Sequence, residues 1–139
     1  MIVAYDIETL KSCFTYTAIN KDTKETYQFV LHKDKFELPE LIDHLNKCEG
    51  GIGFNNINFD YPIIHYILEN QKEWLSDYEN NEEEIINLIY SKAQEIIDAQ
   101  DSDTFYKTIA IPTKKWKIHQ LDLFKLWHYN NKARRRIAA

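Results

Sequence analysis

The sequence is poor in the residues that build linkers, disulfide frameworks and membrane spans. It has three glycines, three prolines and two cysteines among 139 residues, which argues against flexible linkers, collagen-like repeats and low-complexity tails. Cys13 and Cys48 form no Cys-x-x-Cys pair, so zinc-site and redox motifs are excluded. The apolar runs are only a few residues long, too short to span a membrane. Because no secretory signal is present, we expect reduced thiols and a cytoplasmic location, in a bacterium or a phage-infected cell.

The chain also lacks the positive charge that is usual in nucleic-acid binding proteins. Its net charge is −5, which counts mildly against that class. The charges are unevenly placed, because residues 77–103 are acidic and a basic stretch follows them. A basic end beside an acidic site would suit a phosphodiester substrate. The basic residues are Lys107, Lys114, Lys115, Lys117, Lys125, Lys132, Arg134, Arg135 and Arg136.

Hydrophobic patterning predicts a single α/β domain with a mixed sheet, ribonuclease-H-like in the order of its elements. Three strands joined by short turns indicate an antiparallel meander. The opening strand is rich in apolar residues, so we expect it inside the sheet and buried on both faces. Shorter strands are expected at 52–54 and 118–121. The meander strands are Ile2–Ile7, Ser12–Asn20 and Thr26–His32.

Helical spacing of apolar residues predicts the remaining elements. The segment 39–47 begins with Pro39 and ends before Gly50 and Gly51, which accept a left-handed helix end. Asp122 is expected to cap a last helix that runs to Ala139, and 99–114 is expected to be irregular. The other predicted helices are 61–70 and 82–98.

Two groups of residues carry a chemical signal. Asp6 and Glu8 lie two apart on the opening strand, so their carboxylates point to the same face. Near a strand end they could share Mg²⁺ or Mn²⁺, which prefer oxygen ligands. Asp60 follows the Asn-rich segment 55–58 and precedes a helix. Each signal has an ordinary alternative: a solvated acidic pair, and an N-cap aspartate beside a core Phe59.

Together these motifs resemble the DnaQ-like 3′–5′ exonucleases of the ribonuclease-H-like superfamily, whose four metal-binding acids give the label DEDD. The chain looks most similar to the proofreading domains of family B DNA polymerases and to stand-alone phage exonucleases. The first motif of the family reads Asp-x-Glu, as Asp6 and Glu8 do here. Its second motif ends Asn-x-x-x-(x)-Phe-Asp, matched by Asn55 or Asn56 with Phe59 and Asp60.

The resemblance implies hydrolysis with two Mg²⁺ or Mn²⁺ ions, acting on the 3′ end of single-stranded DNA. Asp6 would bridge both ions, while Glu8 holds the ion that activates water and Asp60 holds the other. We therefore expect the three carboxylates to lie within about 8 Å of a common point. The substrate contacts that the resemblance implies are Thr9, Leu10, Asn55, Asn56 and Phe59.

The chain departs from the family in its third motif, which supplies a fourth acid as Tyr-x-x-x-Asp or His-x-x-x-x-Asp. Neither spacing occurs in the 139 residues, and Asp122 lies on the strand before the motif's place, so it is interpreted as structural. We expect an incomplete exonuclease-like domain over 1–139, either part of a longer protein or naturally short. The alternative function is a catalytically incomplete module that keeps the fold and binds nucleic acid or a protein.

The remaining candidates carry weaker signals. His44, His65 and His119 lack metal-ligand spacing and are expected to be structural or on the surface. Trp116 and Trp127 are expected in the core or an interface. The basic run Lys132 to Arg136 could grip phosphates, and a solvated helix end or an oligomer contact are alternatives.

Overall fold

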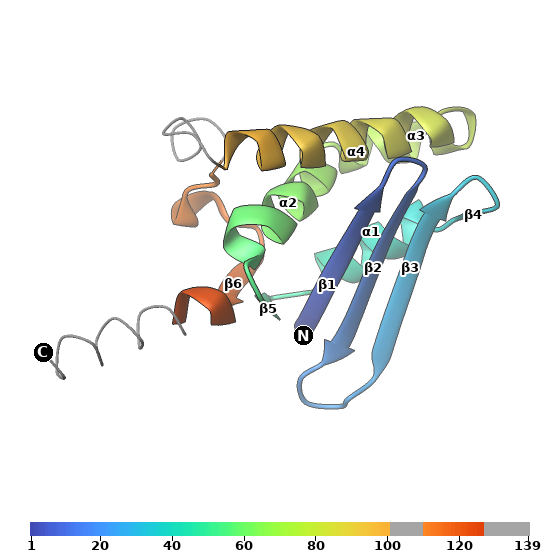
Figure 1. The fold of residues 1–139 in the computed structure, drawn as a ribbon. Coiled ribbons are helices and arrows are strands. Elements are labelled where there is room, and N and C mark those ends of the chain that lie inside the picture. The colour runs from blue at the N-terminus through green and yellow to red at the C-terminus, as the bar shows by residue number, and fades with distance from the viewer. Residues whose placement is uncertain (101–109, 127–139) are drawn as a thin grey trace, which may run out of the picture.

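The computed structural model describes residues 1–100 and 110–126, which form a six-stranded mixed sheet with helices packed on it. The strand order is β4-β3-β2-β1-β5-β6, and Figure 1 shows the long strands β1 to β3 side by side. β2, β3 and β4 follow β1 as an antiparallel meander, whereas β5 and β6 join on the other side of β1 in parallel. The strands are Ile2–Leu10 (β1), Cys13–Asn20 (β2), Thr26–His32 (β3), Lys35–Phe36 (β4), Gly50–Gly53 (β5) and His119–Asp122 (β6).

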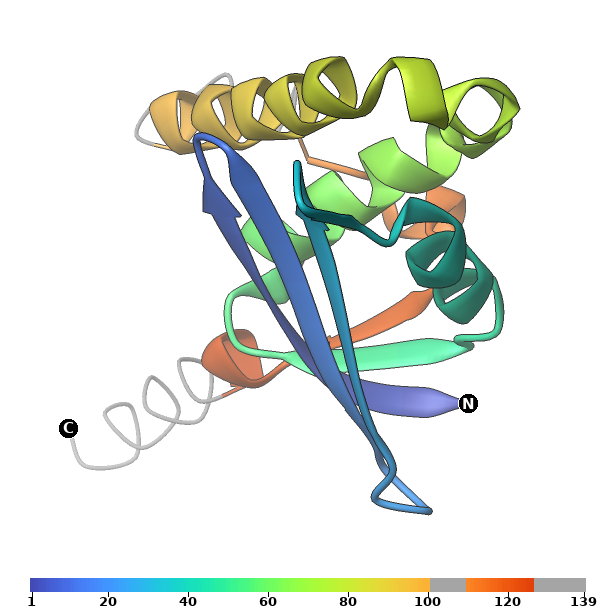
Figure 2. The same cartoon turned by 90° about the vertical axis from the view of Figure 1, so that its right-hand side faces the viewer.

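The helices gather on one face of this sheet (Figures 1 and 2). Helix α4 crosses β1, β2 and β3, while α1 packs on β3. Figure 2 also shows the twist of the sheet, in which β5 and β6 run at a steep angle to β2 and β3. The α-helices are Leu38–Asn46 (α1), Tyr61–Glu69 (α2), Gln71–Ser76 (α3) and Glu82–Ala99 (α4). The shorter helical segments are the π-helix Asn56–Asp60 (η1) and the 3₁₀ turns Tyr78–Asn80 (η2) and Thr113–Lys115 (η3).

The core lies between the helices and the inward face of the sheet. Helical stripes such as Leu38, Leu41 and Leu45 on α1 repeat every three or four residues, which places them on one buried side. Strand residues alternate instead, so every second side chain of β1 and β2 enters the core. The inward strand residues are Val3, Tyr5, Ile7, Phe14, Tyr16 and Ala18.

The predicted position of the opening strand is confirmed, and its predicted burial is wrong. β1 lies inside the sheet and pairs with β2 antiparallel. It is buried on one face only, since Ala4, Asp6 and Glu8 are exposed between buried neighbours. The strand also continues to Leu10 rather than ending at Ile7, so Asp6 and Glu8 lie within it. Charged side chains on alternate residues are compatible with a sheet that faces solvent on one side.

Glycine has a different role from the one predicted after the first helix. Helix α1 ends at Asn46, with Lys47 in a right-handed conformation, and none of the glycines has a positive φ. Gly50 and Gly51 instead open β5, two residues earlier than predicted. A Cβ on Gly51 would lie 2.6 Å from a ring carbon of Tyr5. Glycine is needed there because the tyrosine ring of the neighbouring strand lies against the backbone.

Several elements were not predicted, and one lies outside the described residues. The short strand β4 and helix α3 have too few residues to show a hydrophobic period. Residues 123–126 are helical and begin the predicted last helix; its remainder, 127–139, lies outside the described part. Within 1–100 and 110–126 no helix has the length and apolar character required to cross a bilayer.

The close packing over Gly51 gives a stability prediction. Gly51→Ala should lower the free energy of unfolding by roughly 1–3 kcal/mol, because the added methyl group must displace the Tyr5 ring. Gly50→Ala is the matched control, since its Cβ would meet atoms no closer than 3.4 Å. Urea unfolding of both variants measures the difference. Equal losses for the two variants would show that the Tyr5 contact is not the cause.

Candidate functional site

The unequal lengths of β1 and β5 leave part of β1 without a strand partner on one side. β5 pairs with β1 only over Ile2, Val3 and Ala4, whereas β1 continues to Leu10. After Gly53 the chain leaves the sheet, forms η1 and enters α2. The backbone of η1 therefore passes beside the open edge of β1, and Asp60 is its last residue.

Asp60 uses its carboxylate to bind β1 and not to cap α2. Its Oδ2 atom accepts a hydrogen bond from the Ile7 backbone N–H at 3.2 Å. The backbone of Asp60 is already helical, and its side chain makes no capping hydrogen bond to α2. The ordinary N-cap interpretation is therefore wrong, and Asp60 instead binds the first strand. A π-helix is a rare element that is often found at functional sites.

The Asp60 carboxyl group lies in an environment that opposes its ionisation. The side chain is 6% exposed, and its pKa is raised from 3.8 to about 7, mainly by this burial. The charges of Asp6 and Asp122 also act to raise this pKa, while hydrogen bonds from backbone N–H groups, that of Ile7 among them, act to lower it. Asp6 and Asp60 therefore form a pair of acids that repel each other in a partly dry site.

The third predicted ligand, Glu8, is not brought into this pair. It lies on the same exposed face of β1 as Asp6. Across the described ranges, no three His, Cys, Asp or Glu side chains gather in a way that could hold a metal ion. The structure thus brings Asp60 to Asp6 without assembling the predicted three-carboxylate centre.

The residues predicted to touch the substrate differ in their exposure. Leu10 is exposed at the end of β1, and Thr9 is half-buried. Asn55 is half-buried, with a left-handed backbone of φ 60°. Phe59 packs partly into the core. Asn56 is fully buried, and the predicted contact between its side chain and a substrate stays a prediction.

A polar network that the sequence did not reveal holds the site together. The side-chain amide of Asn56 donates to Gln120 Oε1 at 2.7 Å, and the Tyr5 hydroxyl donates to the same atom at 2.6 Å. Asn56 Oδ1 is buried and has no hydrogen-bond partner among the described residues. Asp122, 3% exposed, accepts backbone N–H groups of the loop before Asp60. The carboxyl ends of parallel strands meet at one sheet edge, and this rule could have pointed to Asp122.

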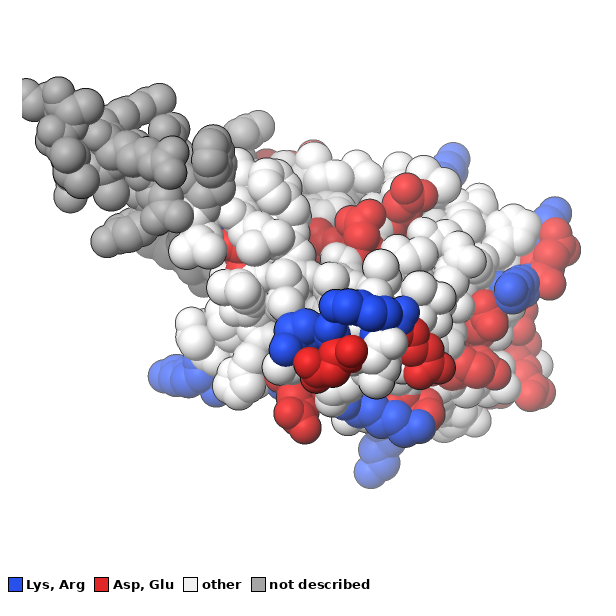
Figure 3. Space-filling model, turned by 90° about the horizontal axis from the view of Figure 1, so that it is seen from below, with Lys and Arg blue, Asp and Glu red and all other residues white. Residues whose placement is uncertain are grey.

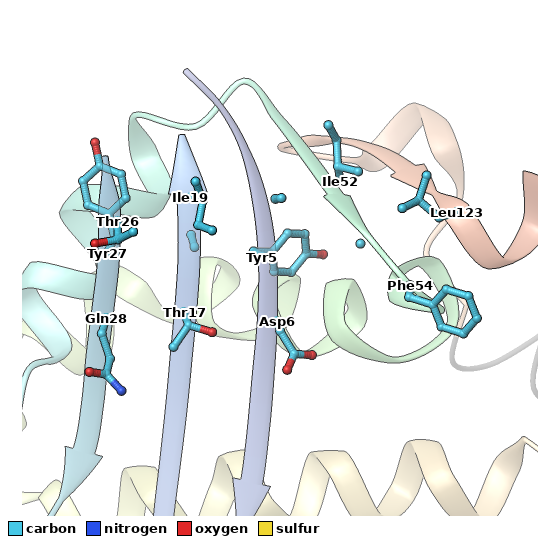
Figure 4. Close-up of a pocket in the computed structure, with 13 residues that line it drawn as sticks. Tyr5, Asp6, Thr17, Ile19, Thr26, Tyr27, Gln28, Ile52, Phe54 and Leu123 are labelled. Carbon is cyan, nitrogen blue, oxygen red and sulfur yellow. The ribbon is translucent and has the colours of Figure 1, made fainter. Parts of the chain in front are cut away.

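Beside Asp6 the outer face of the sheet is hollowed. The hollow has a volume of about 780 Å³. Figure 4 shows Asp6 at its border, with the carboxylate directed to the side of β1 on which Phe54 lies. None of the described residues that line it is Lys or Arg. The remaining lining residues are Ala4, Tyr5, Thr17, Ala18, Ile19, Thr26, Tyr27, Gln28, Ile52, Gly53 and Leu123.

The face of the molecule shown in Figure 3 has no broad basic patch among its described residues. On that face the lysines lie among acidic side chains. Of the predicted basic stretch, Lys114, Lys115, Lys117 and Lys125 are exposed. Lys107, Lys132 and Arg134 to Arg136 lie outside the described residues, so their predicted contact with phosphates stays a prediction.

His44, His65, His119 and Trp116 lie in the core or on the surface, as predicted. His44 is buried 2.9 Å from the Tyr16 hydroxyl, and burial lowers its pKa to about 4. His65 lies between Tyr61 and Glu69 on α2, and His119 is exposed. Trp116 packs against Tyr61 at the border of the core. Trp127 lies outside the described residues.

Comparison of the chain with protein-family models, with curated proteins and with solved structures gives no match. The resemblance to the DnaQ-like exonucleases therefore depends on the motifs alone. The geometry of Asp60 is the structural observation that bears on it.

The raised pKa of Asp60 predicts that this group destabilises the protein at high pH. The unfolded carboxyl group ionises near pH 4, whereas the folded one keeps its proton until about pH 7. The folded state therefore binds more protons between these values, and stability falls as the pH rises through that window. Asp60→Asn removes the ionisation. Relative to wild type, the variant should gain about 2–4 kcal/mol in free energy of unfolding between pH 4 and pH 8.

Urea unfolding of both proteins at pH 4 and pH 8, with EDTA present, measures this change. Asp22→Asn serves as the control because Asp22 lies on the exposed β2–β3 turn. A difference between wild type and Asp60→Asn that is the same at both pH values would contradict the raised pKa.

Proposed function

We propose that this chain is a metal-dependent nuclease domain of the 3′–5′ exonuclease type, which hydrolyses phosphodiester bonds at the 3′ end of single-stranded DNA. The observation that carries the proposal is the hydrogen bond from Ile7 N–H to the Asp60 carboxylate. It brings an acid that follows β5 to the strand that carries Asp6. A plain N-cap aspartate has no reason to leave its helix for that position.

The acidic pair fits one divalent cation by donor type and by charge. Asp6 and Asp60 offer carboxylate oxygens, and Mg²⁺ is commonly held by one or two carboxylates together with water and substrate phosphates. Their mutual repulsion and the burial of Asp60 both oppose two negative charges at this place. A cation of charge +2 would reverse that penalty. A second ion would need Glu8, which the described structure does not join to the pair.

Each residue of the candidate site would have a separate role in binding the ion and the substrate. Asp6, on the exposed face of β1, would hold the ion from the solvent side, and Asp60 would hold it from the protein interior. Ile7 N–H orients the Asp60 carboxylate. The bound ion would supply electrostatic stabilisation of the charge that develops on the phosphate and would lower the pKa of an attacking water. Phe54, 64% exposed at the hollow, offers a ring on which a base could stack.

A second candidate function is a binding module that keeps the exonuclease fold without its chemistry. The absence of a three-acid cluster among residues 1–100 and 110–126 favours it, as does the lack of a third motif in the sequence. The two candidates differ in the expected effect of divalent ions. A nuclease domain requires the Asp6 and Asp60 pair to bind metal, whereas a binding module does not.

Metal binding by the acidic pair is the first prediction from this proposal. Mn²⁺ should bind weakly at pH 7.5, and Asp6→Ala should weaken binding by at least about tenfold because one of two carboxylate ligands is lost. Electron paramagnetic resonance of free Mn²⁺ gives the binding isotherm. Asp43→Ala is the control, since Asp43 is an exposed acid on α1 that forms a salt bridge with the surface residue Lys47. Equal Mn²⁺ affinity in wild type and Asp6→Ala would contradict the proposed metal site.

Cleavage by this chain should be slow or absent. The sequence has neither of the spacings that supply the fourth acid and the Tyr or His that aims the water in the family it resembles, and general-base help alone is typically worth about 10²–10⁴ in rate. The assay follows a 3′-labelled and a 5′-labelled single-stranded oligonucleotide with Mn²⁺, comparing the chain with Asp6→Ala. Robust 3′ digestion that Asp6→Ala abolishes would show that the site is complete, against this expectation.

A further inference from the structure

Asp122 occupies a position at the end of β6 from which it can control the loop that carries Asp60. It pairs in register with Gly53, the last residue of β5. The chain between Gly53 and α2 therefore begins next to Asp122. The Asp122 side chain is 3% exposed, so its negative charge must be satisfied by groups of the protein.

Backbone N–H groups provide that compensation. Oδ1 of Asp122 accepts from Asn55 N–H at 2.8 Å and from Phe124 N–H at 3.0 Å, and Oδ2 accepts from Ile57 N–H at 3.2 Å. Only the Phe124 bond has the form of the helix cap that the sequence predicts. The other two bonds reach across to a segment 65 and 67 residues earlier in the chain. Asp122 thus holds the start of η1 as well as the start of its own helix.

The end of η1 is fixed at a second place. Asp60, three residues after Ile57, binds the Ile7 N–H of β1. The segment from Asn55 to Asp60 is therefore held between β6 on one side and β1 on the other. Its first residue has a left-handed backbone, with φ 60° at Asn55. Asparagine adopts this conformation more readily than most residues that carry a side chain, and the bond from Asn55 N–H to Asp122 fixes its backbone.

We propose that Asp122 is a positioning residue, which places the Asp60 carboxylate beside Asp6 by holding the backbone of Asn55 and Ile57. This inference rests on the proposed metal-dependent function. It also assigns Asp122 a role other than that of the missing fourth ligand, because its two oxygens already accept three N–H groups. Consistently, within the described parts of the chain no group of three acids is arranged to hold a metal ion.

The test is the Mn²⁺ affinity of four proteins at pH 7.5, measured by electron paramagnetic resonance: wild type, Asp122→Asn, Asp60→Asn and Ile86→Ala. Asp122→Asn keeps one acceptor oxygen and turns the other into a donor, which cannot accept the Ile57 N–H. It should weaken Mn²⁺ binding by about tenfold or more, as loss of a group that orients a metal ligand typically does. Ile86→Ala removes a buried side chain of α4 and controls for lost stability. Its Mn²⁺ affinity should equal that of wild type.

Urea unfolding reports the stability of each variant, and circular dichroism confirms that it is folded. If Asp122→Asn does not fold, Asp122→Ser replaces it, because a serine hydroxyl can still cap the helix at Phe124 and is too short to hold both loop N–H groups. The same loss of Mn²⁺ affinity is expected for that variant.

The outcomes distinguish the positioning role of Asp122 from the proposed metal site itself. Weaker Mn²⁺ binding in Asp122→Asn and Asp60→Asn, with unchanged binding in Ile86→Ala, supports the positioning role. Unchanged binding in Asp122→Asn, with loss in Asp60→Asn, overturns the positioning role and leaves the metal site standing. Equal losses in Asp122→Asn and Ile86→Ala overturn it as a mere stability effect. Unchanged binding in Asp60→Asn overturns the proposed metal site, and the role of Asp122 with it.

Discussion

One hydrogen bond, from the backbone N–H of Ile7 to the carboxylate of Asp60, links the two halves of the candidate site. It depends on the shortness of β5, which leaves the edge of β1 beyond Ala4 open to another partner. Had β5 continued, the Ile7 N–H would have been used in the strand ladder, and Asp60 would have been kept away from β1. The parallel pairing of β1 with β5 therefore stops early, and a buried acid lies beside Asp6 in its place.

This arrangement has an electrostatic cost. A carboxyl group that is 6% exposed and lies near a second acid resists ionisation, which is why its pKa is raised to about 7. A purely structural site would be served as well by an asparagine, which can accept the same N–H without the charge. Acidic groups held in unfavourable surroundings are common where charge serves binding or catalysis. The cost is understandable if a divalent cation balances the two carboxylates.

The sequence predicted the parts of the fold that depend on local periodicity. Alternation along Thr26–His32 and the helical stripe of 82–98 correspond closely to β3 and α4. The sequence did not predict contacts between segments that are far apart along the chain. The sequence predicted that Gly51 ends a helix, but a side chain is excluded at this position by the Tyr5 ring on the neighbouring strand β1. Asn56 reads as a polar loop residue, yet its amide is buried against Gln120. In the site, the bond between Ile7 N–H and Asp60 agrees with the expected closeness of Asp60 to the first strand, whereas Glu8 does not join the pair. For Asp122 the sequence predicted the helix cap but not the two contacts to the loop before Asp60, because those partners lie more than sixty residues away.

The central claim is that Asp60 is a buried acid whose natural partner is a cation shared with Asp6. The most direct measurement is the ¹³C chemical shift of the Asp60 carboxyl carbon, followed by nuclear magnetic resonance from pH 3 to pH 9, with and without Mg²⁺. The account predicts titration with a pKa of about 7 in the absence of metal and a clear fall when Mg²⁺ is added, because the cation favours the charged form. A carboxyl group that titrates near its ordinary value and ignores Mg²⁺ would contradict the account.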